Sequence, residues 1–363
     1  MRVVMLVSTL LLGARSAVAQ EATGPKVTFG GFLDAYFAYD FGRPATFDRA
    51  FTTQPARHNE FNVNLAHLEA KLEGNGIRAR LALQAGTSVQ SNYAAEPTVG
   101  AVSGPSLSRH LQEAVAGVRL GRTVWLDGGV YLSHIGSESW ASRDNPTYTR
   151  SLIADYSPYY QAGAKVTWTP SGTVTAQLNV VNGWQIISEN NTAKSVGFRV
   201  DYAAAPSVTL SAYNLIGNEI PSGAGGRTRW FQGASARVAP SVRSLVIATF
   251  DVGVQEGADG ERSSTWYGGA LIGRLQATPR VAVSARVERY ADPDQVIIVT
   301  GGADGFRVWG GSVGLDVVTA ERALWRTEFR GLRSSARIFP DRDGLGGLGR
   351  GNALLVTSLG VTF

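Results

Sequence analysis

Cysteine is absent from the 363-residue sequence, so disulfide bonds contribute nothing to its stability. Histidine is rare, and His58, His67, His110 and His134 show no metal-ligand spacing. Long hydrophobic runs are also missing, because no segment after the N-terminal region approaches the roughly 18 apolar residues of a transmembrane helix. These absences exclude a disulfide scaffold and a helical membrane protein. They leave open a transmembrane β-barrel, whose strands alternate polar and apolar residues.

The N-terminal region has the parts of a secretory signal peptide. Arg2 precedes an apolar run over residues 3–12, and an A-x-A motif ends at Ala19. We therefore expect a signal peptide over residues 1–19, cleaved after Ala19, and a single exported domain over residues 20–363. Loss of the two arginines in this segment lowers the formal net charge from +5 to +3. Such a mild excess gives no indication of nucleic-acid binding.

Apolar residues alternate with small or polar residues along most of the chain. In the C-terminal stretch GNALLVTSLGVTF, Leu355, Leu359 and Phe363 lie on one face, whereas Ser358 and Thr362 lie on the other. A period of two residues is typical of a β-strand, because successive side chains point to opposite faces of the sheet. The alternation predicts sixteen strands, near residues 27–41, 57–73, 77–86, 109–120, 123–134, 159–169, 173–184, 195–203, 207–215, 228–238, 243–255, 264–275, 281–290, 305–318, 323–333 and 351–363.

One predicted strand changes phase in its middle. Phe61, Val63 and Leu65 share one face, but the apolar series then continues at Leu68 and Ala70. An extra residue in one strand of a pair shifts the side chains that follow it to the other face. The change of phase therefore predicts a β-bulge in this strand.

The connections between the predicted strands alternate between long and short. Long loops face one end of a sheet and tight turns the other, and both chain termini then lie on the side of the turns. This layout predicts an all-β fold, a transmembrane antiparallel barrel of about sixteen strands with short periplasmic turns and long extracellular loops. The long loops are 42–56, 87–108, 135–158, 185–194, 216–227, 256–263, 291–304 and 334–350, and the turns are 74–76, 121–122, 170–172, 203–206, 239–241, 277–280 and 319–322.

Tryptophan gives a second indication of a membrane barrel. Seven of the eight tryptophans lie near predicted strand ends, and all of these except Trp125 share the outward phase of their strand. Amphipathic rings favour the membrane–water interface, so a barrel is expected to carry aromatic girdles at its two rims. The seven residues are Trp125, Trp168, Trp184, Trp230, Trp266, Trp309 and Trp325.

Some motifs suggest other chemistry but lack the context that this chemistry needs. Gly344, Gly346 and Gly349 form a GxGxxG pattern, yet a strand follows it instead of the helix of a dinucleotide site. The DRDG and ADPD stretches carry paired aspartates without the remaining ligands of a calcium loop. Ser133 and His134 are adjacent on a strand and point to opposite faces, which disfavours a catalytic pair. We expect no cofactor, no metal and no enzymatic activity.

Charged residues occupy the inward phase of many predicted strands. Eleven basic and eleven acidic residues share this phase, and a dry interior could not hold so many charges at low cost. A barrel of this size is also too wide for side chains to fill. We therefore expect a water-filled lumen, and the balanced charges give no ion preference. The candidate pore-lining residues are Arg78, Arg80, Lys165, Arg199, Asp201, Arg286, Glu288, Arg326, Glu328 and Arg330.

The loop over residues 135–158 is the longest of the eight and carries charges of both signs. A wide pore needs an element that narrows it, and a loop folded into the lumen is the natural candidate. We hypothesise that this loop lines the constriction; the alternative is a loop that projects outward. The candidate constriction residues are Glu138, Arg143, Asp144, Arg150 and Asp155.

Several stretches carry a resemblance to a known family. GGFLDAYFAYDF, NEFNVNLAHLEAKLEG, SESW, YTRSLIADYSPYYQAGAKVTWTP, NVVNGWQ and SAYNLIGNE resemble the OmpL-like putative β-barrel porins of Gram-negative outer membranes. The final Leu359, Val361 and Phe363 look like the C-terminal signal read by the barrel assembly machinery. The resemblance spans most of the exported chain and implies an outer-membrane channel. It supplies no substrate and no established site residues.

The sequence thus predicts a bacterial outer-membrane porin for passive diffusion of small hydrophilic solutes or ions. Two alternatives stay open: a plugged barrel with a structural or adhesive role, and a barrel enzyme. The expected partners are outer-membrane lipid, the assembly machinery through Phe363, and the diffusing solutes. A homotrimer is expected only by analogy with general porins, since no feature of the sequence separates a protomer interface from a lipid-facing patch.

Overall fold

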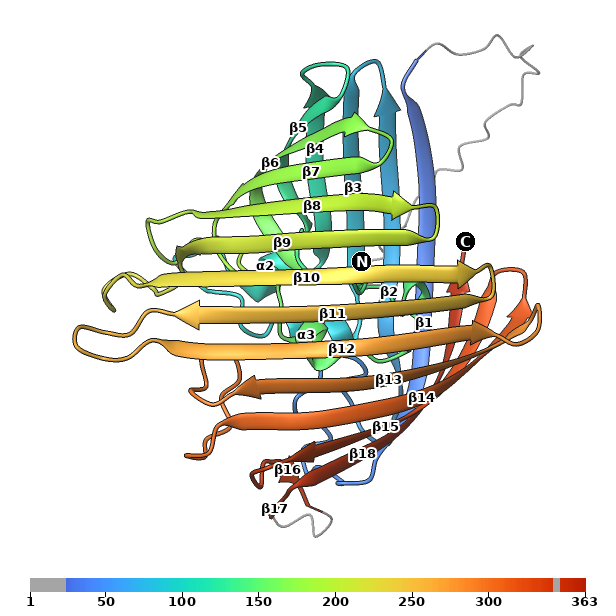
Figure 1. Cartoon of the computed structure of the whole chain (residues 1–363), viewed down its shortest axis with the longest axis vertical. Coiled ribbons are helices and arrows are strands. Elements are labelled where there is room, and N and C mark those ends of the chain that lie inside the picture. Colours follow the sequence, from blue (N-terminus) through green and yellow to red (C-terminus); the bar gives the residue numbers. More distant parts are fainter. Residues whose placement is uncertain (1–23, 342–346) are drawn as a thin grey trace, which may run out of the picture.

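The computed structural model describes residues 24–341 and 347–363. Sixteen antiparallel strands form a closed barrel in which each strand pairs with its sequence neighbours and β1 pairs with β18 (Figure 1). The barrel strands are β1 (Lys26–Asp40), β2 (Glu60–Gly74), β3 (Ile77–Ala85), β4 (Leu111–Arg119), β5 (Val124–Leu132), β6 (Tyr160–Ser171), β7 (Val174–Val181), β8 (Ser195–Ala205), β9 (Val208–Asn218), β10 (Thr228–Ser241), β11 (Ser244–Gln255), β12 (Ser264–Gln276), β13 (Val281–Asp292), β14 (Phe306–Ala320), β15 (Ala323–Ser334) and β18 (Gly351–Thr362).

The long connections lie at one end of the barrel and the tight turns at the other, as Figure 1 shows. Short elements occur within the long connections, and α3 lies inside the ring of strands, in contact with β12 and β13. None of the helices in the described residues is long and apolar enough to span a membrane. The short elements are α1 (Thr87–Asn92), α2 (Pro105–Ser108), the 3₁₀ turn η1 (Ser142–Asp144), α3 (Leu152–Asp155), and the small hairpin of β16 (Phe339–Pro340) and β17 (Leu348–Gly349).

The sixteen predicted strands and the alternation of loops and turns are confirmed. Closure of the barrel also gives a structural role to the C-terminal phenylalanine. Phe363 exchanges two backbone hydrogen bonds with Gly31 on β1, at 2.9 and 3.1 Å. Its ring occupies the position that a Cβ atom on Gly31 would take, so any larger residue there requires this ring to move.

The predicted β-bulge in β2 is confirmed, but it lies two residues earlier than the sequence pattern indicated. Asp34 pairs with Leu65 and the next residue of β1, Ala35, pairs with Val63, which leaves Asn64 as the extra residue. Leu65 therefore points inward, with only 1% of its surface exposed, and does not share the outward face of Val63 as predicted. The bulge places both Asn64 and Leu65 inside the barrel.

The tryptophan prediction is partly wrong. Trp168, Trp309 and Trp325 lie exposed on the outer surface, as a lipid-facing girdle requires. Trp266 instead points inward with 1% of its surface exposed, and Trp184 packs against it inside the barrel. The sequence argument assigned an aromatic residue at a strand end to the membrane interface, but the loop-side interior of this barrel also contains apolar clusters that accept large rings.

The signal peptide over residues 1–19, with its cleavage position after Ala19, lies outside the described residues. The same holds for Gly344 and Gly346 of the GxGxxG pattern, whereas its last glycine, Gly349, lies in β17.

Candidate functional site

Residues 135–158, called the third loop from here on, lie inside the barrel. The Ser142 hydroxyl donates a 2.7 Å hydrogen bond to Asp34 on the inner face of β1. The backbone N–H of Leu152 donates a 2.6 Å hydrogen bond to Glu288 on the inner face of β13. Because these contacts reach two separate parts of the inner wall, the third loop crosses the lumen instead of projecting outward.

Four of the candidate pore-lining residues form a charge network on β13 and β15. Arg286 pairs with Glu288 at 3.2 Å and with Glu328 at 3.5 Å, and Arg330 pairs with Glu288 at 2.9 Å. Arg286 also donates a hydrogen bond of 2.5 Å to the carbonyl oxygen of Thr149 in the third loop. All four charged side chains point inward, but the third loop covers them and leaves them almost fully buried. In this structure they contact the third loop instead of open water.

Arg326, the fifth candidate from this side of the barrel, also holds the third loop. Its Nε donates a 2.8 Å hydrogen bond to Asp316 on β14. Its Nη1 donates to the carbonyl oxygen of Ser142, and its Nη2 donates at 3.0 Å to the carbonyl oxygens of both Asn145 and Pro146. A buried guanidinium with five possible donors can thus satisfy three backbone acceptors in and just after the 3₁₀ turn η1.

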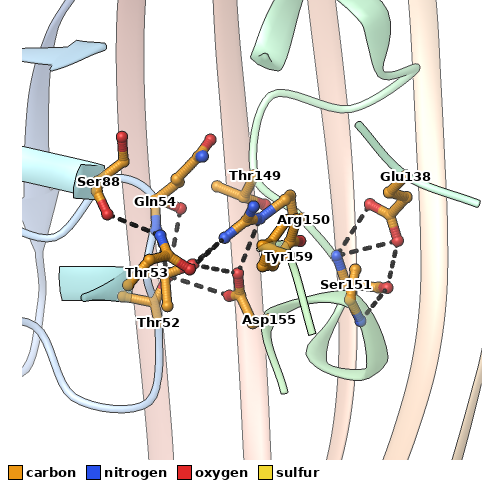
Figure 2. A network of polar contacts seen from close by, with 12 residues as sticks. Thr52, Thr53, Gln54, Ser88, Glu138, Thr149, Arg150, Ser151, Asp155 and Tyr159 are labelled. Carbon is orange, nitrogen blue, oxygen red and sulfur yellow. Dashed lines mark hydrogen bonds and ion pairs between the residues drawn. The ribbon is translucent and has the colours of Figure 1, made fainter. Parts of the chain in front are cut away.

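Two of the predicted constriction residues form a buried ion pair within the third loop (Figure 2). Arg150 and Asp155 are 3.0 Å apart, and neither side chain is exposed. The Arg150 guanidinium lies 3.5 Å from the centre of the Tyr159 ring, a cation–π arrangement. The Thr53 hydroxyl, from the first loop, donates a 2.5 Å hydrogen bond to Asp155. The sequence analysis did not identify Thr53, because a threonine in a polar loop carries no distinguishing signal.

Glu138, another predicted constriction residue, stabilises the bend of the third loop before α3. Its carboxylate accepts hydrogen bonds from the backbone N–H of Ser151, at 3.1 Å, and from the Ser151 hydroxyl (Figure 2). Burial raises the pKa of Glu138, while the nearby positive charge of Arg286 acts in the opposite direction. Glu138 is thus a structural acid in a poorly solvated position that disfavours its charged form.

The wall opposite the buried network carries basic side chains that stay half-exposed. On β3, Arg78 pairs with Asp127 of β5 at 2.5 Å, and its guanidinium lies 4.4 Å from the centre of the Trp125 ring. Trp125 therefore points inward, as its phase predicted. The flat ring supports one face of the guanidinium and leaves its edge toward the lumen.

Arg80, the next inward residue of β3, bridges two acids on its neighbouring strands. It pairs with Glu69 on β2 at 2.6 Å and with Glu113 on β4. Glu69 also pairs with Lys71 at 3.0 Å. The side chains of Lys71 and Arg80 are 41% and 30% exposed, against 12% and 7% for the two acids. The acids therefore lie against the wall, and the cations lie closer to the water.

The remaining pore-lining candidates continue this wall toward β8. Lys165 on β6 lies with its Nζ 4.3 Å from the centre of the Tyr131 ring. Arg199 on β8 donates to Asp201 at 2.8 Å and to the carbonyl oxygen of His134 at 2.8 Å. Both Arg199 and Asp201 stay partly exposed. Arg199 also donates a 2.9 Å hydrogen bond to the carbonyl oxygen of Gly136, so it contacts the start of the third loop.

Arg143 and Asp144 form the exposed edge of the third loop. Asp144 is 55% exposed, and Arg143 is 27% exposed with its guanidinium 4.7 Å from the centre of the Phe32 ring. These two residues are the charged constriction candidates that still reach open space. Of the predicted set, the structure therefore brings Arg150, Asp155 and Glu138 into internal contacts of the third loop and leaves Arg143 and Asp144 at its edge.

One inward-facing base was missed because the phase of β12 was misread. Trp266 and Arg274 share a face of β12, and the sequence analysis placed that face on the membrane side. In the structure both point inward, and Arg274 pairs with Asp316 on β14. A strand whose inward face carries a tryptophan and an isoleucine gives a weak alternation signal, so its orientation could not be fixed from the sequence alone.

The third loop separates two cavities in the interior. A cavity of about 320 Å³ lies between the start of this loop and β8, with Trp140, Tyr159 and Arg199 in its wall. A second cavity of about 390 Å³ lies on the side of the tight turns, with Arg143 and Arg326 in its wall. The described residues contain no cluster of three or more potential metal ligands.

Ser133 and His134, considered as a catalytic pair from the sequence, make separate contacts. The two ring nitrogens of His134 lie 2.8 Å from the side-chain oxygen of Gln161 and 2.8 Å from the carbonyl oxygen of Asn214. The Ser133 hydroxyl accepts a 3.1 Å hydrogen bond from the backbone N–H of Ile135. His134 thus fixes the third loop to the strands below it.

Comparison with known proteins gives a family and a set of similar folds. The family model described as "Putative beta-barrel porin-2, OmpL-like" matches residues 26–363. No curated protein matches the chain. Among solved structures, the chain is similar to the outer-membrane channel DcaP of Acinetobacter baumannii, with 10% identity and a TM-score of 0.63 over 96% of this chain and all of that one.

Two further solved structures show the same architecture. The anion-selective porin from Comamonas acidovorans has 12% identity and a TM-score of 0.59, over 93% of this chain and 100% of that one. The in-vitro folded trimer form of OmpT from Vibrio cholerae has 7% identity and a TM-score of 0.60, over 94% of this chain and 100% of that one. At such low identity the similarity establishes the fold of the barrel.

Proposed function

This chain belongs to the OmpL-like family of β-barrel porins of the outer membrane, and on that premise we propose that small hydrophilic solutes diffuse passively past its third loop. The observation that carries the proposal is the half-exposed charge of the inner wall. Lys71, Arg78 and Arg80 keep about a third of their side-chain surface free, although a fully packed interior would bury it. Hydrated charges along a lumen are expected where water fills it.

Within this proposal the predicted site residues divide into two groups. The charges on the exposed part of the wall and on the edge of the third loop line the path of the solute. The buried charges of β13 and β15, together with Arg326, Arg150, Asp155 and Glu138, hold the third loop in the lumen and so set the width of the constriction. The proposed path-lining residues are Arg78, Arg80, Lys165, Arg199, Asp201, Arg143 and Asp144.

Solute uptake by proteoliposomes tests this function directly. Liposomes that contain the refolded protein are transferred into isosmotic solutions of arabinose, glucose and a larger oligosaccharide. A pore narrowed by the third loop predicts rapid swelling in the small sugars and slow swelling in the large one. Folding is verified in the same sample by the change of electrophoretic migration on heating. A folded protein that gives no swelling in any solute would contradict the proposal.

A specific observation also favours a sealed barrel as the second candidate. The third loop lies across the lumen, and a cluster of buried apolar side chains packs around it, with Leu152, Phe231 and Trp266 among its members. If this packing closes every path, the protein would serve adhesion or envelope structure. A sealed barrel predicts no solute uptake and no ionic current from correctly folded protein. No catalytic step belongs to either proposal.

The outer face of the four neighbouring strands β3, β4, β5 and β6 supports the proposal of a trimer. Ala79, Ala114, Ala116, Gly128 and Ala164 lie on the outward faces of β3, β4, β5 and β6. Small side chains allow the wall of a second protomer to approach closely in a membrane. Trimeric forms occur among proteins of this fold. We therefore place the proposed protomer interface on this face, and outer-membrane lipid covers the rest of the outer surface.

Export and assembly complete the proposed path of the chain to the outer membrane. A signal peptide cleaved after Ala19 would release the chain into the periplasm. The C-terminal strand, with Phe363 at its end, would then be recognised by the barrel assembly machinery. The position of Phe363 at the seam of β1 and β18 supports this proposal, because the last strand must stay accessible until the barrel closes.

A further inference from the structure

The cavity of about 390 Å³ on the side of the tight turns has a strongly basic wall. It lies between the third loop and the turn-side ends of the strands from β12 to β1. Guanidinium groups reach it from four different places: the third loop, β12, the turn after β14, and β15. The arginines are Arg143, Arg274, Arg322 and Arg326, and the two acids of the same wall are Asp34 and Glu321.

Two of these arginines keep hydrogen-bond donors that their neighbours do not use. Arg274 donates only through Nη1, to Asp316 and to the carbonyl oxygen of Pro146, so its Nε and Nη2 have no partner among the described residues. Arg143 makes only long hydrogen bonds, through Nη1, to Gly31 and Thr362 at 3.4 and 3.3 Å, and its Nε lies 3.7 Å from Asp144, so its Nη2 has no partner among the described residues. Arg326, in contrast, uses its donors to hold the third loop.

A buried hydroxyl in the same wall also lacks a partner. Ser358 on β18 is 4% exposed, and its Oγ makes no hydrogen bond to any described residue. A buried hydroxyl without a partner costs free energy, so a group that binds in the cavity can recover that cost. The hydroxyl can donate to an anion that lies between Arg143 and Arg274.

The acids near the cavity are already neutralised or shielded. Asp34 is 1% exposed and accepts hydrogen bonds from Asn64 and Ser142, at 2.8 and 2.7 Å. Asp316 is 3% exposed and pairs with both Arg274 and Arg326. Glu321 lies next to Arg322 in an exposed turn and offsets the charge of that one arginine. The wall therefore keeps a net positive charge, because Arg274 and Arg326 share the single carboxylate of Asp316, whereas Arg143 is offset in part by Asp144 at 3.7 Å.

The neighbouring wall, formed by β2 and β3 next to β1, has the same sign of accessible charge. The side chains of Lys71, Arg78 and Arg80 are 41%, 32% and 30% exposed, whereas the acids that pair with them are 4–12% exposed. The exposed acids on this side include Asp144, Asp201, Glu73 and Glu321. A solute that passes the third loop on the turn side thus meets more accessible cations than anions, and a low-dielectric wall strengthens their field.

We propose that the cavity between Arg143 and Arg274 is an oxyanion site on the diffusion path, and that the pore consequently prefers small solutes that carry a carboxylate or phosphate group. The inference rests on the proposed function, since it assigns the substrate class of the same lumen. Guanidinium groups suit this role because their planar N–H donors match the two oxygens of a carboxylate or phosphate. The free Ser358 hydroxyl would supply a further donor.

The test is electrical, in a planar bilayer with a KCl gradient across the intact, refolded protein. The sign of the reversal potential reports whether chloride or potassium passes more readily. Inorganic phosphate is then titrated into symmetric KCl, and its half-blocking concentration for the chloride current is measured; acetate is titrated in parallel to separate phosphate from carboxylate recognition. We expect a chloride preference and saturable block by phosphate.

The variants Arg143→Gln and Arg274→Gln locate the site. Each removes a charge that can hydrogen-bond to the anion, and we expect the half-blocking phosphate concentration to rise about tenfold for each. The matched control is Arg289→Gln, since Arg289 lies on the outer face of β13 over the Trp309 ring and should leave block unchanged. The hydrogen bonds of Arg143 are long, so Arg143→Gln should disturb folding little. This variant therefore keeps the test valid if Arg274→Gln folds poorly.

The outcomes separate the two proposals. Discrete current steps with a potassium preference, or with a chloride preference that neither phosphate nor the two variants affect, would overturn the anion site while a diffusion pore stands. Absence of steps from protein shown to be folded would instead overturn the proposed function itself.

Discussion

At the scale of single residues, the barrel seam depends on one glycine. Gly31 on β1 lies under the ring of Phe363, and a Cβ atom there would overlap that ring. The terminal ring can move only by giving up its place against the seam. We expect Gly31→Ala to destabilise the folded barrel by about 1 kcal/mol, at the low end of the cost of inserting a methyl group, because the displaced ring of Phe363 is 58% exposed.

The measurement is the midpoint of urea unfolding of protein refolded in detergent micelles. A second variant shows whether the clash with the ring is the cause. In a Phe363→Ala background the overlap is gone, so Gly31→Ala should then cost much less. An equal cost in both backgrounds would show that the backbone of β1, and not the terminal ring, requires the glycine.

Glu138 predicts a pH dependence of the third loop. Its pKa is raised in the folded protein by burial, with Ser151, Arg286 and Glu288 as the groups that face it. A carboxyl group of this kind contributes its full stability below its unfolded pKa near 4.5. That contribution is lost as the pH rises through the higher folded value. The third loop should therefore be held more firmly at mildly acidic pH than at neutral pH.

Current noise between pH 4 and pH 7 measures this effect, because a loosely held loop fluctuates in the pore. We expect the noise to increase with pH in the wild type and to lose most of its pH dependence in Glu138→Gln, which keeps the shape of the side chain without its charge. Identical pH profiles for the two proteins would show that Glu138 does not control the third loop.

Residue patterns predicted which side chains point inward, but not which of them meet water. Arg286, Glu288, Glu328 and Arg330 have the inward phase expected from alternation, yet the third loop buries them. Alternation reports only the face of the sheet, whereas burial depends on contacts between residues more than 100 positions apart, such as Leu152 with Glu288. The sequence carries no local signal for such contacts.

At the scale of elements, the third loop is tethered to several strands at once, and this predicts a fixed constriction. The Ser137 hydroxyl of the third loop lies 2.7 Å from the Thr249 hydroxyl of β11. Both oxygens are γ atoms, so a cysteine at each position would place two sulfur atoms within reach of a disulfide bond. The natural chain has no cysteine, so no other disulfide can form.

We expect the double variant Ser137→Cys, Thr249→Cys to form this disulfide in the folded protein without added strain on the loop. Conductance before and after reduction with dithiothreitol should agree closely, because the bond only fixes a contact that already exists. Each single-cysteine variant is the control. A large change of conductance on reduction would show that the third loop moves out of the lumen during conduction.

Elements were easier to predict than their orientation. All sixteen strands follow from alternation and turn residues because both are local properties of the chain. The bulge in β2 was found as a change of phase but placed two residues late, since Asn64 and Leu65 both point inward there. The orientation of β12 was lost because Trp266 looked like a girdle residue, and Arg274 was lost with it.

At the scale of the whole molecule, the small residues on the outer face of β3 to β6 predict the oligomeric state. A large ring at Ala164 on β6 would separate two walls that pack through small residues. We expect Ala164→Trp to convert a trimer into monomers in detergent, measured by light scattering coupled to size-exclusion chromatography. Val287→Trp, on the outer face of β13, is the control and should leave the trimer intact. A wild type that is monomeric under these conditions would contradict the trimer.

The size and charge of the lumen also belong to the whole molecule, and neither could be predicted from the sequence. Eleven charges of each sign in the inward phase suggested no ion preference. The asymmetry lies in depth, since acids such as Glu113 and Asp127 lie against the wall and their cationic partners reach toward the lumen. Depth depends on how side chains stack in three dimensions, which residue counts cannot reveal.

Single-channel recording of the wild type beside a variant with a shortened third loop is the most direct test of a water-filled pore narrowed by that loop. The variant replaces residues 139–149, which include the exposed edge, with a short glycine–serine linker. The account predicts discrete steps for the wild type and clearly larger steps for the variant. Folded wild-type protein without steps, or steps of equal size in both proteins, would contradict it.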